Sequence, residues 1–181
     1  VDIALYDAFC KSLGVSLGDF LGVHLKPIET SVTLGIKDVE ETKAEFEALR
    51  AEGFSVFKVK IGENIENDIE RVRKLSEWGG KGVRIRVDAN EGYAKADLLR
   101  FALATNVELI EQPFSAPASN EMRELDRHIS GHCMADEDLK TRRDAIELLR
   151  GPLPYGSWNI KLMKSGGITN RKWLANYAAL Q

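Results

Sequence analysis

Two lysines, Lys58 and Lys60, stand two residues apart within a short apolar run, residues 57–61. On a β-strand, this spacing places both side chains on the same face. Burying two ammonium groups side by side is costly, but burial and like charge also lower the pKa of a lysine and turn it into a usable base. The alternative is an edge strand whose lysines face solvent and prevent aggregation. This segment alone favours the edge strand.

Later apolar runs also end in charged residues, where a turn residue is the default. They are Asp88, Glu111, Asp136 with Glu137, and Lys161. A single acid in such a position is more often a helix N-cap than a functional group. Charges at five successive run ends, however, form a pattern that is improbable by chance, and this pattern reverses the first interpretation of the two lysines.

The chemistry that this pattern predicts is proton transfer beside a metal ion. If the three carboxylates converge, they repel one another, and a hard divalent cation such as Mg²⁺ resolves the repulsion. The lysines flank the acids in sequence, so around a closed ring Lys60 and Lys161 face each other across the metal. This layout suits removal of a proton from one face of a carbon and its return to the other. The metal would stabilise the enediolate that forms when the α-proton of a carboxylate leaves.

The elements that must position these residues alternate between strands and helices. Strand candidates about 24 residues apart are typical of successive βα units in a parallel sheet. We expect strands at residues 32–36, 56–61, 83–87, 107–110, 132–135 and 158–162. We expect helices at residues 39–51, 65–78, 95–104, 120–129, 141–149 and 170–180. A (β/α)8 barrel carries its catalytic groups at the carboxyl ends of its strands and needs eight such units. The sequence therefore predicts an α/β fold, a TIM-type (β/α)8 barrel that is incomplete here at about six units.

The first residues of the chain precede this alternation. Residues 2–13 have helical spacing with Gly14 as the C-cap, and a short turn at residues 17–21 follows before Gly22 and Pro27. We expect a boundary near Pro27. Residues 1–27 would then belong to a preceding domain, and residues 28–181 would form the partial barrel.

Several polar residues have an ordinary structural interpretation. We expect Asp138 to cap the following helix and Lys164 to lie on the surface or in a loop. Arg84 and Arg86 are expected to form ion pairs inside the barrel. The histidines lack metal-ligand spacing and are expected to be structural: His24, His128 and His132.

Composition excludes several classes of function. The formal net charge of −3 provides no electrostatic footprint for nucleic acid or a membrane surface, so we expect neither partner. The sequence has neither a Gly-x-Gly-x-x-Gly fingerprint nor a Walker loop, which disfavours a nucleotide-binding sheet. Cys10 and Cys133 lie far apart and form neither a disulfide framework nor a zinc cluster. Cysteine usage therefore favours a reducing compartment, and we expect the cytoplasm.

Five motifs in order resemble the enolase superfamily, and within it the muconate lactonizing enzyme subgroup. Phe-Lys-Val-Lys at residues 57–60 resembles the Lys-x-Lys motif, and Asn-Ile-Lys-Leu-Met-Lys-Ser-Gly-Gly at residues 159–167 resembles the sixth-strand lysine motif. The three metal-ligand motifs are matched by Val-Asp-Ala-Asn at 87–90, Ile-Glu-Gln-Pro at 110–113 and Met-Ala-Asp-Glu at 134–137. Residues 2–22 resemble the last helix of the family's N-terminal α+β capping domain. Within the subgroup, the chain looks most like the dipeptide epimerases, such as the L-Ala-D/L-Glu epimerases.

The resemblance implies a role for each matched residue. Lys60 and Lys161 would be the two acid/base groups. Lys58 would lower the pKa of Lys60 and contact the substrate carboxylate, and Thr33 matches a substrate-contacting threonine. The ligands of Mg²⁺, with Mn²⁺ as the alternative ion, would be Asp88, Glu111 and Asp136. The implied protein is an isomerase that acts on a small carboxylate, a dipeptide, and forms a homo-oligomer at full length.

Two alternatives remain open at this point. A muconate-type cycloisomerase or an o-succinylbenzoate synthase-like enzyme would use the same metal and lysines. An inactive, truncated barrel fragment is the other class, because the seventh and eighth units and most of the capping domain are expected to lie outside this sequence. Asp138 also departs from the family, which usually has Ser there, and the segment between Asp88 and Glu111 is shorter than expected.

Overall fold

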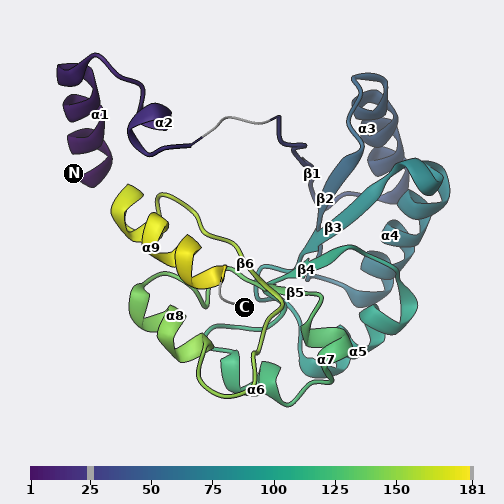
Figure 1. Ribbon diagram of the computed structural model, residues 1–181. Coiled ribbons are helices and arrows are strands. Elements are labelled where there is room, and N and C mark those ends of the chain that lie inside the picture. The colour runs from purple at the N-terminus through teal and green to yellow at the C-terminus, as the bar shows by residue number, and fades with distance from the viewer. Residues whose placement is uncertain (24–26, 180–181) are drawn as a thin grey trace.

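Six parallel strands in chain order form the centre of the computed structural model, which describes residues 1–23 and 27–179 (Figure 1). They are β1 (Val32–Leu34), β2 (Val56–Lys60), β3 (Arg84–Asp88), β4 (Leu109–Glu111), β5 (Cys133–Ala135) and β6 (Ser157–Trp158). The predicted strand order and parallel direction are confirmed. The last strand is wrong in extent. It ends at Trp158; the Asn159 amide still donates to the Ala135 carbonyl at 2.8 Å, and farther on the chain turns and bonds locally, with the Ser165 amide donating to the Lys161 carbonyl at 3.1 Å.

Helices follow the strands and lie on the outer face of the curved sheet (Figure 1). The main ones are α3 (Val39–Ala51), α4 (Ile65–Gly79), α5 (Lys95–Ala104), α8 (Arg142–Leu148) and α9 (Ile168–Ala178), and a short 3₁₀ turn, η1 (Gly80–Gly82), follows α4. The helix predicted at 120–129 is two short helices instead, α6 (Ser119–Arg123) and α7 (Arg127–Ser130). Asp126 separates them, because its carboxylate caps the second helix by accepting from the His128 amide at 2.7 Å. Residue 180, the predicted end of the last helix, lies outside the described residues.

Alternation along β2 decides which side chains face the helices. Phe57 and Val59 are fully buried, and the Phe57 ring lies 4.7 Å from the Phe46 ring of α3. Lys58 and Lys60 point to the opposite face, as the two-residue period requires. Because β2 is paired with both β1 and β3, it is an interior strand, and the edge-strand interpretation is wrong.

The N-terminal helices α1 (Asp2–Leu13) and α2 (Leu17–Phe20) lie at the α9 end of the molecule (Figure 1). Gly14 ends α1 with a φ of 67°, as predicted. The Asp2 carboxylate accepts from the Ile168 amide and the Thr169 hydroxyl, each at 2.6 Å, at the start of α9. The Thr169 hydrogen bond lowers the pKa of Asp2. None of the helices in the described part of the chain has the length and apolar character that crossing a membrane requires.

Candidate active site

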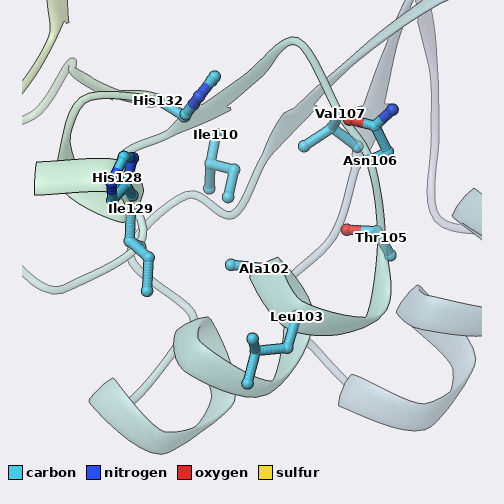
Figure 2. Close-up of a pocket in the computed structure, with 9 residues that line it drawn as sticks. All are labelled: Ala102, Leu103, Thr105, Asn106, Val107, Ile110, His128, Ile129 and His132. Atoms are coloured by element: carbon cyan, nitrogen blue, oxygen red, sulfur yellow. The ribbon is translucent and has the colours of Figure 1, made fainter. Parts of the chain in front are cut away.

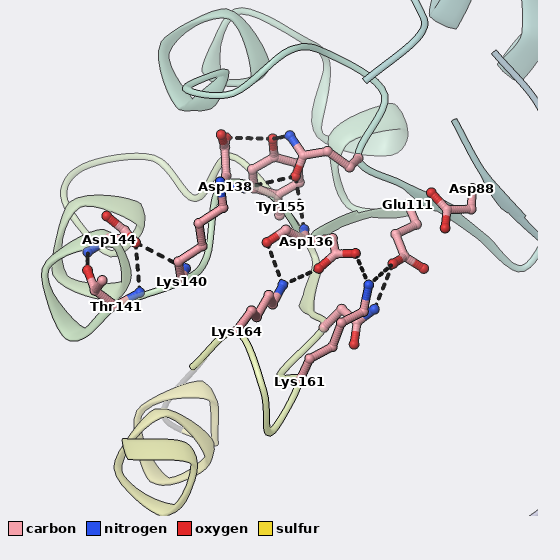
Figure 3. A network of polar contacts seen from close by, with 12 residues as sticks. Asp88, Glu111, Asp136, Asp138, Lys140, Thr141, Asp144, Tyr155, Lys161 and Lys164 are labelled. Carbon is pink, nitrogen blue, oxygen red and sulfur yellow. Dashed lines mark hydrogen bonds and ion pairs between the residues drawn. The ribbon is translucent and has the colours of Figure 1, made fainter. Parts of the chain in front are cut away.

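Three carboxylates stand at the carboxyl ends of three adjacent strands. Asp88 ends β3 and Glu111 ends β4, and the parallel register pairs them directly. Asp136 follows the last residue of β5. All three side chains are buried, and they lie in a row at the carboxyl ends of the strands (Figure 3). The sequence prediction that these acids belong to one cluster at the strand ends is therefore in agreement with the backbone register.

Two lysines approach this cluster from β2. The Lys58 ammonium lies 2.8 Å from Asp88 Oδ2 and 2.5 Å from Glu111 Oε2. The Lys60 ammonium lies 2.8 Å from the same Asp88 oxygen and donates to Asn90 Oδ1 at 2.5 Å. Thr33 on β1 is the register partner of Lys58, so the two residues stand side by side.

Two further lysines approach from the segment after β6. The Lys161 ammonium pairs with Asp136 and lies 3.7 Å from Glu111 Oε1 (Figure 3). Lys164 pairs with the other Asp136 oxygen and donates to the Asp136 backbone carbonyl at 2.5 Å. It lies in a turn, as the expectation of a loop residue allowed, but its side chain is only 17% exposed and faces the cluster instead of the surface. The sequence signal that could have found Lys164 is its spacing of three residues from Lys161, because residues three apart in a tight turn can lie on the same side.

Burial and neighbouring charges act on these acids in opposite directions. Burial raises the pKa of Glu111, and the contact with Asp136 and the charge of Asp88 raise it further. Burial alone would raise the pKa of Asp136, but contacts with Glu111, Lys161 and Lys164 lower it to about 2. Burial would lower the pKa of Lys58, yet its contacts with Asp88 and Glu111 leave it raised. The lysines therefore favour the charged form of Asp136, and Glu111 is the acid whose charged form is opposed by its surroundings.

The donor chemistry fits a hard divalent cation. The three candidate ligands offer carboxylate oxygens and no nitrogen or sulfur, which is the set that Mg²⁺ prefers. In their present arrangement, no three His, Cys, Asp or Glu side chains among the described residues form a ready-made metal cage. Each acid is instead engaged by a lysine, as described above. The fit therefore rests on the oxygen donors of the three acids.

Gln112 is a buried residue that the sequence did not single out. Its φ of 34° lies in the left-handed region, which costs a non-glycine residue about 1–3 kcal/mol. Its side-chain oxygen accepts from the amides of Asp136 at 2.9 Å and Asp138 at 3.2 Å. Its amide nitrogen donates to the Phe114 carbonyl at 2.9 Å and contacts the Tyr155 hydroxyl at 3.3 Å. Gln112 therefore fixes the backbone that carries Asp136.

Asp138 is part of this support and is not a helix cap. Thr141 caps α8 instead, in a reciprocal pair of bonds with Asp144. The Asp138 carboxylate accepts from the Ala118 amide at 3.0 Å. It also accepts from the Tyr155 hydroxyl at 2.8 Å (Figure 3). The predicted cap is wrong because Asp138 lies too early in the chain and turns into the interior.

Other polar residues behave as the sequence indicated. Arg84 and Arg86 both form ion pairs with Glu108, at 3.2 Å and 2.6 Å.

Two asparagines that contact the cluster were missed in the sequence. Asn159 donates to Glu111 Oε1 at 2.6 Å and so holds the second acid from the β6 side. Asn90, also missed, has a φ of 43°, which presents its side chain to Lys60.

A pocket of about 270 Å³ lies at the opposite ends of β4 and β5 (Figure 2). It contains none of the acids or lysines described above, and its two histidines, His128 and His132, face it without an acidic partner in its lining. Its lining residues are Ala102, Leu103, Thr105, Asn106, Val107, Ile110, His128, Ile129 and His132. Catalytic residues of parallel barrels lie at the carboxyl ends, so this pocket is at the wrong end for the cluster to use. The third histidine, His24, lies outside the described residues.

Sequence comparison places this geometry among known proteins. Residues 41–180 match the family described as Enolase C-terminal domain-like. The chain is 44% identical to an L-Lys-D/L-Arg epimerase of Desulforapulum autotrophicum, over 98% of this chain and 51% of that protein. It is 31% identical to an L-Ala-D/L-Glu epimerase of Bacillus subtilis, over 93% of this chain and 48% of that protein.

A solved structure agrees in three dimensions. The dipeptide epimerase of Methylococcus capsulatus, complexed with Mg and the dipeptide L-Arg-D-Lys, superposes with a TM-score of 0.92 at 40% identity, over 99% of this chain and 51% of that one. The chain thus spans about half the length of the curated relatives that it matches. The fold and the site together define a partial parallel α/β barrel that carries acids and lysines at the carboxyl ends of its strands. This chain belongs to the enolase C-terminal domain-like family.

Proposed function

We propose that this chain carries the catalytic strands of a Mg²⁺-dependent epimerase, which removes and returns the proton α to a carboxylate of a dipeptide. The observation that carries the proposal is the arrangement of the lysines. Lys60 meets the acid cluster at Asp88, and Lys161 meets it at Asp136 and Glu111. Two bases on different sides of one cluster are what inversion at a carbon requires, because one takes the proton and the other returns it.

Each side chain has a task in this proposal. Lys60 and Lys161 take and return the proton, each on its own face of the α-carbon. Lys58, with Thr33 beside it in register, binds the substrate carboxylate and balances the charge of Asp88 and Glu111. Asp88, Glu111 and Asp136 would hold the ion, and a bound Mg²⁺ would supply stabilisation for the negative charge that develops as the proton leaves.

Support for the dipeptide comes from the relatives, whose names specify dipeptides. We propose that dipeptides with a cationic residue, such as those named for the 44% identical relative, are the first to be tested.

Two further proposals concern the location and the domain organisation of the protein. We propose that it is cytoplasmic, and that a boundary near Pro27 separates the barrel from a capping domain.

The test uses the protein expressed from its whole coding sequence. It is incubated with Mg²⁺ and single-configuration dipeptides in D₂O, and the product is analysed by mass and by chirality. We expect a second configuration to appear, with one deuterium at the α-carbon, and the reaction to stop when EDTA removes the metal. A product with a changed molecular formula or ring count would instead indicate a cycloisomerase or a dehydratase. An inert protein that also fails to bind Mg²⁺ would indicate an inactive barrel.

A further inference from the structure

A buried ion pair on α4 has no part in the proton-transfer chemistry described so far. Asp68 and Arg71 lie one turn apart, and their side chains pair at 3.0 Å. Each residue is only 2% exposed. Aspartate and arginine are seldom fully buried, and a buried pair is often no better for stability than apolar residues of the same size. Stability alone therefore does not explain this pair.

The two side chains of the pair each bind a backbone group at the end of β2. Arg71 Nη2 donates to the carbonyl oxygen of Lys60 at 2.5 Å. Asp68 Oδ2 accepts from the amide of Gly62 at 2.9 Å. Gly62 has a φ of 109°, and a Cβ there would lie 2.4 Å from the Ala89 carbonyl oxygen, so only glycine fits this turn. The backbone of Lys60 is thus fixed where the strand leaves the sheet.

The same pair also reaches the loops after the two neighbouring strands. Arg71 Nη1 lies 3.4 Å from the carbonyl oxygens of Gly35 and Lys37, in the loop after β1. The Tyr93 hydroxyl, in the loop after β3, donates to Asp68 Oδ2 at 3.0 Å. One buried pair therefore connects the loops after β1, β2 and β3, and the central loop carries Lys60.

We propose that Arg71 and Asp68 are positioning residues for Lys60. The inference rests on the proposed function, in which Lys60 is one of the two bases. A lysine has a long, flexible side chain, and the Lys60 side chain is 34% exposed, so its reach depends on where its backbone is anchored. A displacement of about 1 Å at a reacting group can cost about 10²-fold in rate, which is the effect that a buried anchor prevents.

The test compares Arg71→Met with Arg73→Met in the full-length protein. Arg73 is on the same helix and also donates to a backbone carbonyl, that of Ala104, at 2.8 Å, but it is remote from β2. We expect Arg71→Met to lower kcat by about 10- to 100-fold with little change in KM, and Arg73→Met to leave both unchanged. Arg71→Lys keeps the charge but not the planar fork, and it should recover only part of the loss. It also serves if Arg71→Met does not fold.

A second readout separates positioning from general loss of stability. Each base exchanges the α-proton of one substrate configuration with solvent, and Lys60→Ala identifies the configuration that depends on Lys60. In D₂O, Arg71→Met and Arg71→Lys should slow deuterium entry into that configuration at least about 10-fold, and leave exchange in the other configuration within about 2-fold. Equal slowing of both configurations, or no slowing of either, would overturn the proposal.

A third readout does not depend on the reaction. Amide hydrogen exchange of peptides that cover residues 57–63 should accelerate in Arg71→Lys, while peptides that cover residues 133–139 should not. If the unmodified protein shows no epimerisation but this local acceleration is found, the proposed function fails and the anchoring of β2 stands. If exchange at residues 57–63 is unchanged, the positioning role fails, whatever the activity.

Discussion

The two sides of the acid cluster are built in different ways. Lys60 ends a five-residue strand that is paired on both sides, and a buried ion pair fixes its backbone. Lys161 follows a strand of two residues, which has one strand neighbour among the described residues, and its side chain is 47% exposed. On that side it is the acid that is anchored, because Gln112 binds the backbone amide of Asp136. This chain therefore orients one of the two proposed bases through its backbone and the other through the acid that it contacts.

The largest effects are expected from the two bases themselves. Lys60→Ala and Lys161→Ala should each reduce turnover by about 10²–10⁴-fold or more, since each removes a proton-transfer group. Binding of Mg²⁺, measured by calorimetry, should survive in both. Lys81→Ala, a lysine exposed in η1, is the matched control and should keep full turnover. If either variant epimerised the substrate at the normal rate, the lysine on that side would not be a base. The contrast between the two sides of the cluster would then not hold.

The next effect concerns the acid that both β2 lysines contact. Asp88→Asn removes one negative charge and should weaken Mg²⁺ affinity by about 10-fold or more, because carboxylate oxygens are the ligands this ion favours. Asp126→Asn is the same chemical change at an acid that caps α7 and does not contact the cluster, and it should leave Mg²⁺ affinity unchanged. Titration by calorimetry measures both. Equal affinities for the two variants would exclude Asp88 as a ligand.

A smaller effect is expected at the support of the β5 side. Gln112→Met keeps the side-chain length but leaves the amides of Asp136 and Asp138 without their acceptor. The free energy of unfolding should fall by about 1–3 kcal/mol, which is typical of buried donors that lose their partner. Urea unfolding of the full-length protein measures it. An unchanged midpoint would show that the Gln112 network does not hold the β5 side.

The smallest effect is expected at the outer member of the β2 support. Tyr93→Phe removes one donor to Asp68, which keeps its bonds to Gly62 and Arg71. The loss should be about 1 kcal/mol or less, with turnover nearly unchanged. Urea unfolding and the epimerisation rate measure the two quantities. If Tyr93→Phe lowered turnover as much as Arg71→Met does, Tyr93 and not the ion pair would position Lys60.

Sequence alone predicted the parts of the site that depend on strand order and register. Asp88 and Glu111 could be placed together because parallel strands end at the same edge of the sheet. Gln112 and Arg71 could not be found this way, because their roles come from contacts between segments far apart in the chain. The edge-strand interpretation of β2 could be rejected from the sequence, because charges recur at the ends of successive apolar runs, and the sheet confirms that β2 has a neighbour on each side.

In the proposed mechanism, Lys60 and Lys161 act on opposite faces of one carbon. The direct test is deuterium entry from D₂O into each configuration of the substrate, measured for Lys60→Ala and Lys161→Ala in the full-length protein with Mg²⁺. Each variant should lose exchange in one configuration and retain it in the other, with the two patterns reversed. Loss of exchange in the same configuration for both variants, or retention in both configurations for either, would contradict it.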